Sequence, residues 1–232
     1  MPNSIYLLSA TSAAIALMHT VVGPDHYVPF IALAHANAWS RGKTLLVTLL
    51  CGIGHVAGSI MLGGAGIVAG LALNRLQAFE SIRGTIAVWA MIAFGILYAL
   101  WGVKRSLQDK QHTHASHDGA TISHSHFGHA HTHHTHSRRE STVWMLFIVF
   151  VLGPCEPLIP IVMYPAVRQS MEGMLFIIGI FSVVTILTML TLVLLGSAGM
   201  SLLPSRFTAR WMHALAGGAI ALSGLMIVVF GL

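Results

Sequence analysis

Two short motifs place ionisable or thiol side chains inside long apolar stretches of the sequence. The first is Gly-Pro-Asp-His at 23–26, and the second is Gly-Pro-Cys-Glu at 153–156. A charged side chain within a lipid bilayer costs several kcal/mol, so such residues are rare in membrane spans and are usually functional. We therefore expect Asp25, His26 and Glu156 to take part in function, with a structural ion pair or a helix cap as the alternative for Asp25.

Histidines in two neighbouring apolar stretches add to these groups. His19 and His55 fall at similar depth, and glycines on both sides of His55 allow another helix to approach closely. Each histidine can act as a metal ligand or can donate a hydrogen bond to a backbone carbonyl. Cys155 is in the same way either a ligand or a small packing residue.

Together these side chains have the chemistry of a transition-metal site. Imidazole with carboxylate and thiolate suits nickel, cobalt, zinc or copper, whereas oxygen ligands alone would favour magnesium or calcium. A bound divalent cation would also neutralise carboxylates near the midplane of a bilayer. The predicted transport site comprises Asp25, His26, His55, Glu156, His19 and Cys155.

A separate histidine tract indicates metal handling outside the apolar stretches. Ten of the fifteen histidines lie between His112 and His136, many as His-x-His pairs. Tracts of this composition cannot bury a core, and they gather borderline metals with modest selectivity. We predict a disordered segment whose candidate ligands are His112, His114, His124, His126, His129, His131, His133, His134 and His136.

The composition requires a largely lipid environment. Of the 232 residues, 55% are hydrophobic and 8% are charged, and the mean hydropathy is +0.77, whereas soluble domains carry about 25% charged residues. The formal net charge of +5 is attributed to cytoplasmic loops and not to nucleic-acid binding.

The sequence contains no Gly-rich phosphate loop, and we predict no enzymatic activity. Both cysteines fall in apolar stretches, which argues against a disulfide framework.

Six apolar segments are each long enough to cross a membrane, since about 20 residues span the hydrocarbon core. The first exceeds the length of one straight span, and the Gly-Pro step at 23–24 predicts a break within it. The N-terminus carries no Lys or Arg, which predicts a retained helix and not a cleaved signal. The six segments are Ile5–Ala36, Thr44–Leu73, Gly84–Val103, Thr142–Val167, Gly173–Ser197 and Trp211–Leu232.

The positions of the basic residues predict the orientation in the membrane. Nine Lys and Arg residues fall in connections on one side of the predicted spans and three, namely Arg75, Arg83 and Arg168, on the other. Because cytoplasmic loops carry the excess of positive charge, both termini are predicted outside a cell (inner) membrane and the histidine tract in the cytoplasm. Four tryptophans at predicted helix ends on the cytoplasmic side agree with an interfacial aromatic belt.

The two Gly-Pro motifs also indicate an internal repeat. Each is followed by further proline, and they align at a constant offset that makes Thr185 the counterpart of His55. Each half has three helices, an odd number, so the second half enters the membrane in the opposite sense to the first. Many transporters have this inverted repeat. We predict a first three-helix repeat at 1–103, a cytoplasmic histidine-rich loop at 104–141 and an inverted repeat at 142–232.

A polar stripe recurs at every third position of the fifth segment, at Ser182, Thr185, Thr188 and Thr191. We interpret these side chains as hydroxyls that pack against a neighbouring helix, with the lining of a transport pathway as the alternative.

These residues resemble the nickel/cobalt permeases. His19 followed by Asp25-His26, Gly54-His55 and the cytoplasmic histidine-rich loop are similar to the six-helix branch that includes nickel/cobalt efflux proteins and urease-accessory membrane proteins. In that family the His-x4-Asp-His signature is implicated in metal selection, a role that the resemblance assigns to His19, Asp25 and His26. Five residues separate His19 from Asp25 here. On a continuous helix the extra residue would rotate His19 by about 100°, unless the Gly-Pro break absorbs it.

The wider superfamily supplies two alternatives. A membrane thiol-disulfide electron carrier would use Gly153-Pro154-Cys155, but its exchange chemistry needs a second cysteine where this chain has Asp25. A sulfite-type anion exporter would meet repulsion from Asp25 and Glu156. We therefore expect an all-α, six-helix secondary transporter of divalent transition metals, nickel or cobalt first and zinc next, with no tightly bound cofactor. The expected partners are the metal ion and the lipid bilayer, with a cytoplasmic metallochaperone and a second copy of the chain as further candidates.

Overall fold

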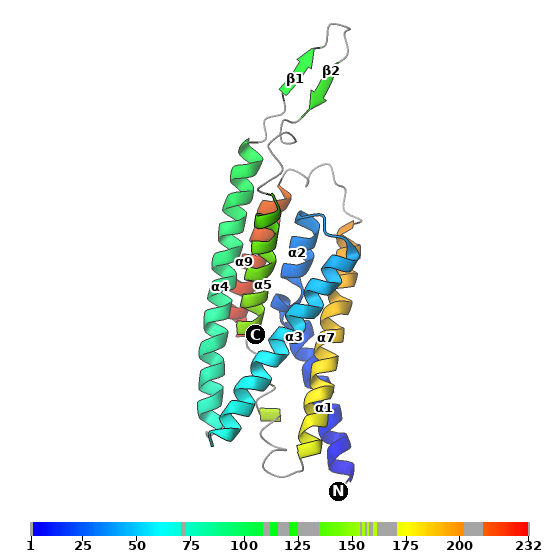
Figure 1. Cartoon of the computed structure of the whole chain (residues 1–232), viewed down its shortest axis with the longest axis vertical. Helices are drawn as coiled ribbons and strands as arrows, with labels where there is room; N and C mark the ends of the chain where they lie inside the picture. The colour runs from blue at the N-terminus through cyan, green and yellow to red at the C-terminus, as the bar shows by residue number, and fades with distance from the viewer. Residues whose placement is uncertain are drawn as a thin grey trace.

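The computed structural model describes residues 2–70, 73–108, 112–115, 121–124, 135–153, 155, 157, 160–161, 171–201 and 211–231. These residues form a bundle of helices with a small hairpin at one end (Figure 1). The N-terminus lies at the end opposite the hairpin. In Figure 1, α1, α2, α4 and α7 run toward the hairpin end, and α3, α5 and α9 run away from it.

The first predicted segment is broken where the sequence analysis places the break. Helix α1 (Pro2–Val22) ends at Gly23 and is followed by the 3-10 turn η1 (Pro24–His26) and by α2 (Val28–Ala36). Gly23 still donates its backbone N–H to the His19 carbonyl at 3.0 Å. Pro24 then occupies the first position of the 3-10 turn, where its missing N–H leaves no helical hydrogen bond unmade.

The next two helices are longer than the hydrocarbon core requires. Helix α3 (Arg41–Val68) has 28 residues, and α4 (Leu73–Gln108) has 36, or about 54 Å at 1.5 Å per residue. Gly84 is the predicted start of the third span, whereas α4 starts eleven residues earlier, at Leu73. As a consequence Glu80 and Arg83 are helical and not part of a connecting loop.

The second half contains α5 (Thr135–Leu152), α7 (Met171–Ser201) and α9 (Met212–Phe230). In the described part of the chain, five helices are long and apolar enough to cross a membrane, namely those containing Ile5–Val22, Arg41–Gly66, Leu73–Gln108, Met171–Met200 and Met212–Phe230. The apolar part of α5, Thr142–Leu152, is shorter than a full span. The predicted segment Thr142–Val167 is thus not one continuous helix, since α5 ends directly before Gly153.

The most extensive helix contacts are those of α4 with α9 and of α1 with α7, followed by α2 with α9, α3 with α5 and α3 with α7. Two glycines allow the backbones of α4 and α9 to touch. A Cβ at Gly95 would lie 2.8 Å from the Gly217 carbonyl oxygen, and a Cβ at Gly217 would lie 2.6 Å from the Gly95 carbonyl oxygen. Small residues at such crossings are a common feature of membrane helix pairs.

The distribution of side chains is that of a membrane protein. Large apolar side chains are exposed on the outer faces, among them Leu97 at 65% and Leu195 at 65%, while Ser59, Glu80 and Thr185 are buried. This is the reverse of the pattern in soluble proteins, where exposed surface carries the charged residues. Together with the five long apolar helices, it defines a multi-pass helical membrane protein.

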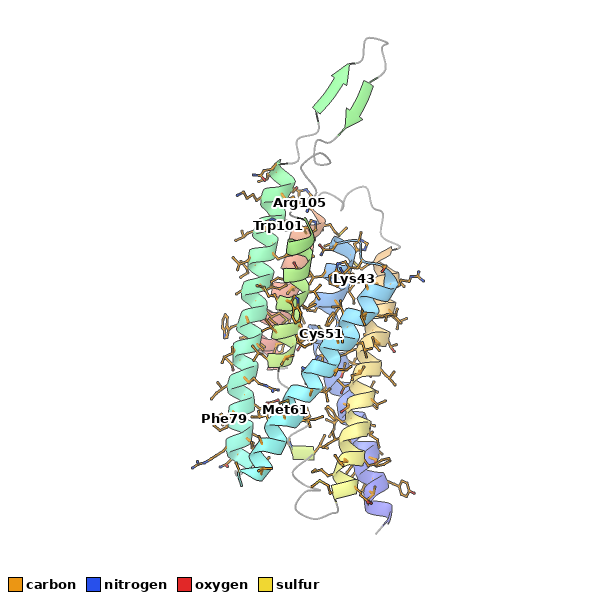
Figure 2. All side chains as sticks on the ribbon, viewed as in Figure 1. Lys43, Cys51, Met61, Phe79, Trp101 and Arg105 are labelled. Carbon is orange, nitrogen blue, oxygen red and sulfur yellow. The ribbon has the colours of Figure 1, made fainter. Side chains whose placement is uncertain are left out.

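Basic and aromatic residues mark one end of the bundle. Figure 2 places Lys43, Trp101 and Arg105 toward the hairpin end, and Met61 and Phe79 toward the opposite end. The Lys43 ammonium lies 5.2 Å from the centre of the Trp39 ring, and the Arg105 guanidinium lies 5.5 Å from that of Trp101. Cations stacked on tryptophan are typical of a helix end in the interfacial region.

Two short strands and the start of α5 are described within the histidine tract. Strands β1 (His112–Ala115) and β2 (Thr121–His124) pair antiparallel, with His112 opposite His124. His136 belongs to α5. The remaining candidate ligands of the tract, His126, His129, His131, His133 and His134, lie outside the described residues.

Candidate metal centre

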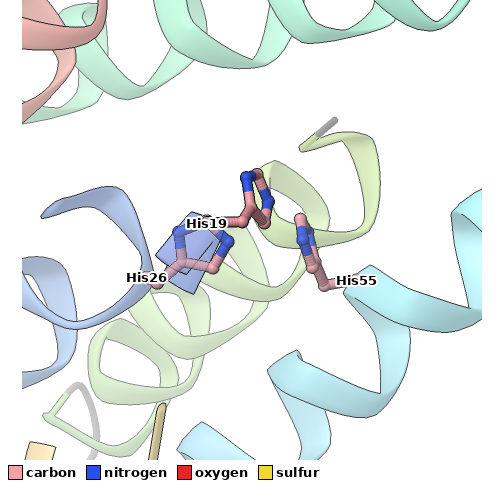
Figure 3. Close-up of side chains that lie close together, drawn as sticks. All are labelled: His19, His26 and His55. Atoms are coloured by element: carbon pink, nitrogen blue, oxygen red, sulfur yellow. The ribbon is translucent and has the colours of Figure 1, made fainter. Parts of the chain in front are cut away.

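Three histidines from three separate elements converge at the first chain break. His19 comes from the last turn of α1, His26 from η1 and His55 from the middle of α3, and their side chains point toward one another (Figure 3). One ring nitrogen from each lies within 4.8 Å of the others. The centre of the His26 ring lies 4.8 Å from that of His19 and 5.1 Å from that of His55. We call these residues the trihistidine cluster.

The local chain fixes the orientation of the His26 ring. Its Nδ1 lies 3.0 Å from an Asp25 carboxylate oxygen and 3.1 Å from the Gly23 carbonyl oxygen. Both partners accept hydrogen bonds only, so Nδ1 carries the proton and Nε2 presents its lone pair. Side-chain exposure is 2% for His26 and 23% for Asp25. Asp25 therefore orients the His26 ring in this structure, as carboxylates beside metal-binding histidines commonly do.

His55 is oriented in the same way by the opposite half of the protein. Its Nδ1 lies 3.3 Å from the Phe150 carbonyl oxygen in the last turn of α5. Because a carbonyl can only accept, His55 also carries its proton on Nδ1 and directs Nε2 away from α5. His55 is 1% exposed, so this arrangement is buried.

The Nε2 atoms of all three histidines are buried without a hydrogen-bond partner. A buried polar atom without a partner is costly and needs an explanation. One ring nitrogen from each of these three histidines lies within 4.8 Å of the others, so the cluster has the geometry to hold a metal ion. Ligands around a tetrahedral ion at about 2.0–2.1 Å would be about 3.4 Å apart, a distance that small ring rotations reach.

The break between α1 and α2 explains how His19 and His26 meet although five residues separate His19 from Asp25. His19 lies one turn before the end of α1, and the 3-10 turn re-aims His26 toward it across the Gly-Pro step. The five-residue spacing is therefore compatible with a shared site. The site also lies at the C-terminal end of α1, and the negative end of a helix dipole favours a cation.

A small cavity adjoins the cluster on the side of α4. It has a volume of about 20 Å³, enough for one water-sized occupant, and lies against Asp25 and His55. Its other walls are Ala87, Val88, Met91, Val149, Phe150 and Gly153. The lining is almost wholly apolar, so the polar groups that face this space come from the predicted site residues.

The other predicted site residues are not part of the cluster. Cys155 is fully buried among Ala16, Val56 and Phe181, and the only described group of three or more metal-binding side chains within reach of one ion is the trihistidine cluster. Glu156 lies outside the described residues. Cys51 is buried in a different apolar cluster, and both cysteines are free.

One charged group was missed by the sequence analysis. Glu80, 1% exposed, pairs with Arg83 at 2.6 Å inside the bundle, and Ser59 donates to the same carboxylate oxygen at 2.8 Å. Arg83 was predicted in a connection between spans, but it lies within α4. The i, i+3 spacing of two opposite charges was the available signal, since such residues face each other on a helix.

Comparison with known protein families, characterised proteins and solved structures found no match to this chain. Its class is therefore defined by its own fold and site: a multi-pass helical membrane protein with a buried trihistidine cluster at a helix break.

Proposed function

We propose that this chain is a secondary transporter that carries divalent transition-metal ions across a membrane, with nickel or cobalt as the preferred cargo and zinc as the next candidate. The observation that carries the proposal is the convergence of three histidines at the break between α1 and α2, each with a buried Nε2 atom that has no hydrogen-bond partner. Neutral imidazoles oriented through Nδ1 are ligands for borderline metals and not for magnesium, calcium or anions.

The location of the cluster supports transport over a purely structural metal site. It lies where a membrane helix is interrupted, and broken helices at the interface of two halves are the usual substrate sites of secondary transporters. Two of the ligands belong to the broken helix, and the third is oriented by a carbonyl of the other half. A relative movement of the halves would change the geometry at the ion.

The helix pairing supports an inverted repeat of two three-helix halves. Such a repeat makes the contact between α1 and α7 the counterpart of that between α5 and α3, and it pairs α4 with α9 across the symmetry axis. Contacts of all three kinds are present, alongside those of α2 with α9 and of α3 with α7. In this proposal α5 belongs to the fourth span, Thr142–Val167, most of whose residues after Gly153 lie outside the described part of the chain.

The proposed orientation has both termini outside and the hairpin in the cytoplasm. Lys43 and Arg105 lie toward the hairpin end, whereas Arg75 is near the start of α4, at the other end. Since positive residues concentrate on the cytoplasmic side, the hairpin end is the cytoplasmic one.

The test is metal transport by cells that express the chain. Metal accumulation and metal tolerance are measured for nickel, cobalt and zinc in the same cells, because the sign of the change gives the direction of transport. His26→Ala and His55→Ala should both reduce the effect to the level of cells without the protein. His35→Ala, on α2 but outside the cluster, is the control and should retain it. Wild-type transport by the His26→Ala variant would contradict the proposal.

A further inference from the structure

Glu80, Arg83 and Ser59, here called the latch, hold the chain at the second break. One oxygen of Glu80, Oε1, accepts from Ser59 Oγ at 2.8 Å, from Arg83 Nη2 at 2.6 Å and from the Cys155 N–H at 2.9 Å. Arg83 Nη2 also donates to the Gly153 carbonyl at 3.1 Å. The latch thus joins α3 and α4 to the residues on either side of position 154.

The two backbone groups held by the latch, the Gly153 carbonyl and the Cys155 N–H, follow directly after the end of α5. Helix α5 stops at Leu152, and the residue between Gly153 and Cys155 is a proline, which has no N–H. Arg83 supplies the donor for Gly153, and Glu80 supplies the acceptor for Cys155. The ion pair therefore substitutes for helical hydrogen bonding across the break.

A glycine on α3 makes this close contact sterically feasible. A Cβ at Gly58 would lie 2.8 Å from the Val151 carbonyl oxygen and 3.2 Å from Arg83 Nη1. With glycine there, the end of α5 and the Arg83 side chain both pack directly on α3. The position of the end of α5 relative to α3 is consequently set by contacts on two sides.

That position determines the orientation of His55. The Phe150 carbonyl that accepts from His55 Nδ1 also accepts from the Gly153 N–H at 3.1 Å. A Cβ at Gly153 would lie 3.3 Å from His55 Nδ1. Gly153, whose carbonyl is held by Arg83, is therefore bonded directly to the Phe150 carbonyl that orients His55. A shift of Gly153 should move the Phe150 carbonyl with it.

We propose that Glu80 and Arg83 are positioning residues of the metal site, which fix His55 Nε2 toward the ion by holding the second break. This inference rests on the proposed function. The pair carries no net charge, so it does not compete for the cation. A buried ion pair adds little stability for the cost of its desolvation, which favours a role in fixing geometry.

The test is cobalt binding to the purified full-length chain in detergent. The ten histidines between His112 and His136 are replaced by glutamine so that the loop does not contribute, and Co²⁺ is titrated by its visible absorption. Glu80→Gln should weaken Co²⁺ binding about tenfold, the scale seen for outer-shell partners of metal ligands, and should shift the absorption bands. Glu172→Gln, an exposed acid at the start of α7, is the matched control and should change neither.

A double substitution separates positioning from a general structural effect. If the latch acts through His55, Glu80→Gln should cause no further loss of Co²⁺ affinity in a His55→Ala chain. Equal loss in both backgrounds would overturn the proposal, as would a Glu80→Gln chain that behaves like Glu172→Gln. Should Glu80→Gln not fold, Arg83→Lys serves instead, because lysine keeps the charge but lacks the planar fork. The same dependence on His55 is expected, and its absence would overturn the proposal.

The parent chain distinguishes this inference from the proposed function. The parent is the chain with the ten loop histidines replaced. If it binds Co²⁺, and if His26→Ala abolishes this binding while Glu80→Gln has no effect, only the proposed role of the latch is overturned. Absence of Co²⁺ binding by the parent would overturn both.

Discussion

At the scale of single residues, the chemistry of the cluster depends on which nitrogen of each imidazole carries the proton. Asp25 and the Gly23 carbonyl hold the proton of His26 on Nδ1, and the Phe150 carbonyl does the same for His55. With the proton on Nδ1, the Nε2 atoms of His26 and His55 carry a free lone pair, and both are buried without a hydrogen-bond partner.

Replacing Asp25 with Asn should weaken metal binding about 10- to 100-fold while the cluster remains assembled. An amide keeps the shape of the carboxylate but removes the negative charge that makes His26 a better donor to a cation. Isothermal titration of the purified chain with Ni²⁺ would measure the change. Unaltered affinity would show that Asp25 does not tune His26.

Gly23→Ala should weaken metal binding by a comparable factor without touching a ligand. A Cβ at position 23 would lie 2.6 Å from His26 Nδ1 and 2.7 Å from an Asp25 carboxylate oxygen, so these two side chains must separate. Gly64→Ala on α3, where a Cβ meets nothing within 4 Å, is the control. The same titration applies, and equal affinities in the two variants would contradict the geometry described for η1.

At the scale of elements, helix packing depends on small residues where backbones meet. Gly217→Leu should disrupt the contact between α4 and α9, because the added side chain would meet the Gly95 carbonyl and not a side chain that can move. Overpacking of this kind costs about 1–3 kcal/mol or more. Gly218→Leu, in the same helix but with open space around it, should be tolerated. Thermal unfolding of the two variants in detergent measures the difference, and equal melting temperatures would contradict the packing.

The sequence predicts elements well where apolar runs dominate and poorly where charge is buried. The break at 23–24 follows from proline chemistry, and the structure confirms it. The start of α4 does not follow from hydropathy, because Glu80 and Arg83 look like the end of a span until their partnership is known. The role of Phe150 in orienting His55 was not predictable, since it depends on a contact between residues 95 positions apart.

The convergence of the histidines was predicted only in part. His26 and His55 were expected to meet, and the structure brings them together. The place of His19 did not follow from the sequence because of the extra residue before Asp25. In the structure its ring centre lies 4.8 Å from that of His26. Cys155 was expected close to the site as a ligand or a packing residue, and its surroundings of Ala16, Val56 and Phe181 favour packing.

At the scale of the whole molecule, the account requires that the hairpin end face the cytoplasm. Single cysteines introduced as Ser116→Cys and Ser170→Cys, in a chain whose own cysteines are replaced by alanine, should label from opposite sides of the membrane. Position 170 should react with a membrane-impermeant reagent in intact cells, and position 116 only after the cells are opened. Labelling of both positions in intact cells would contradict the orientation.

The central claim is that three imidazoles from His19, His26 and His55 bind one metal ion inside the membrane domain. X-ray absorption at the nickel edge tests it most directly, on a chain with the histidines of residues 112–136 replaced by glutamine and loaded with one equivalent of Ni²⁺. We predict scattering from three imidazole rings, and from two when His55 is replaced by alanine. A nickel ion surrounded by oxygen or sulfur ligands, or an imidazole count unchanged by His55→Ala, would contradict the account.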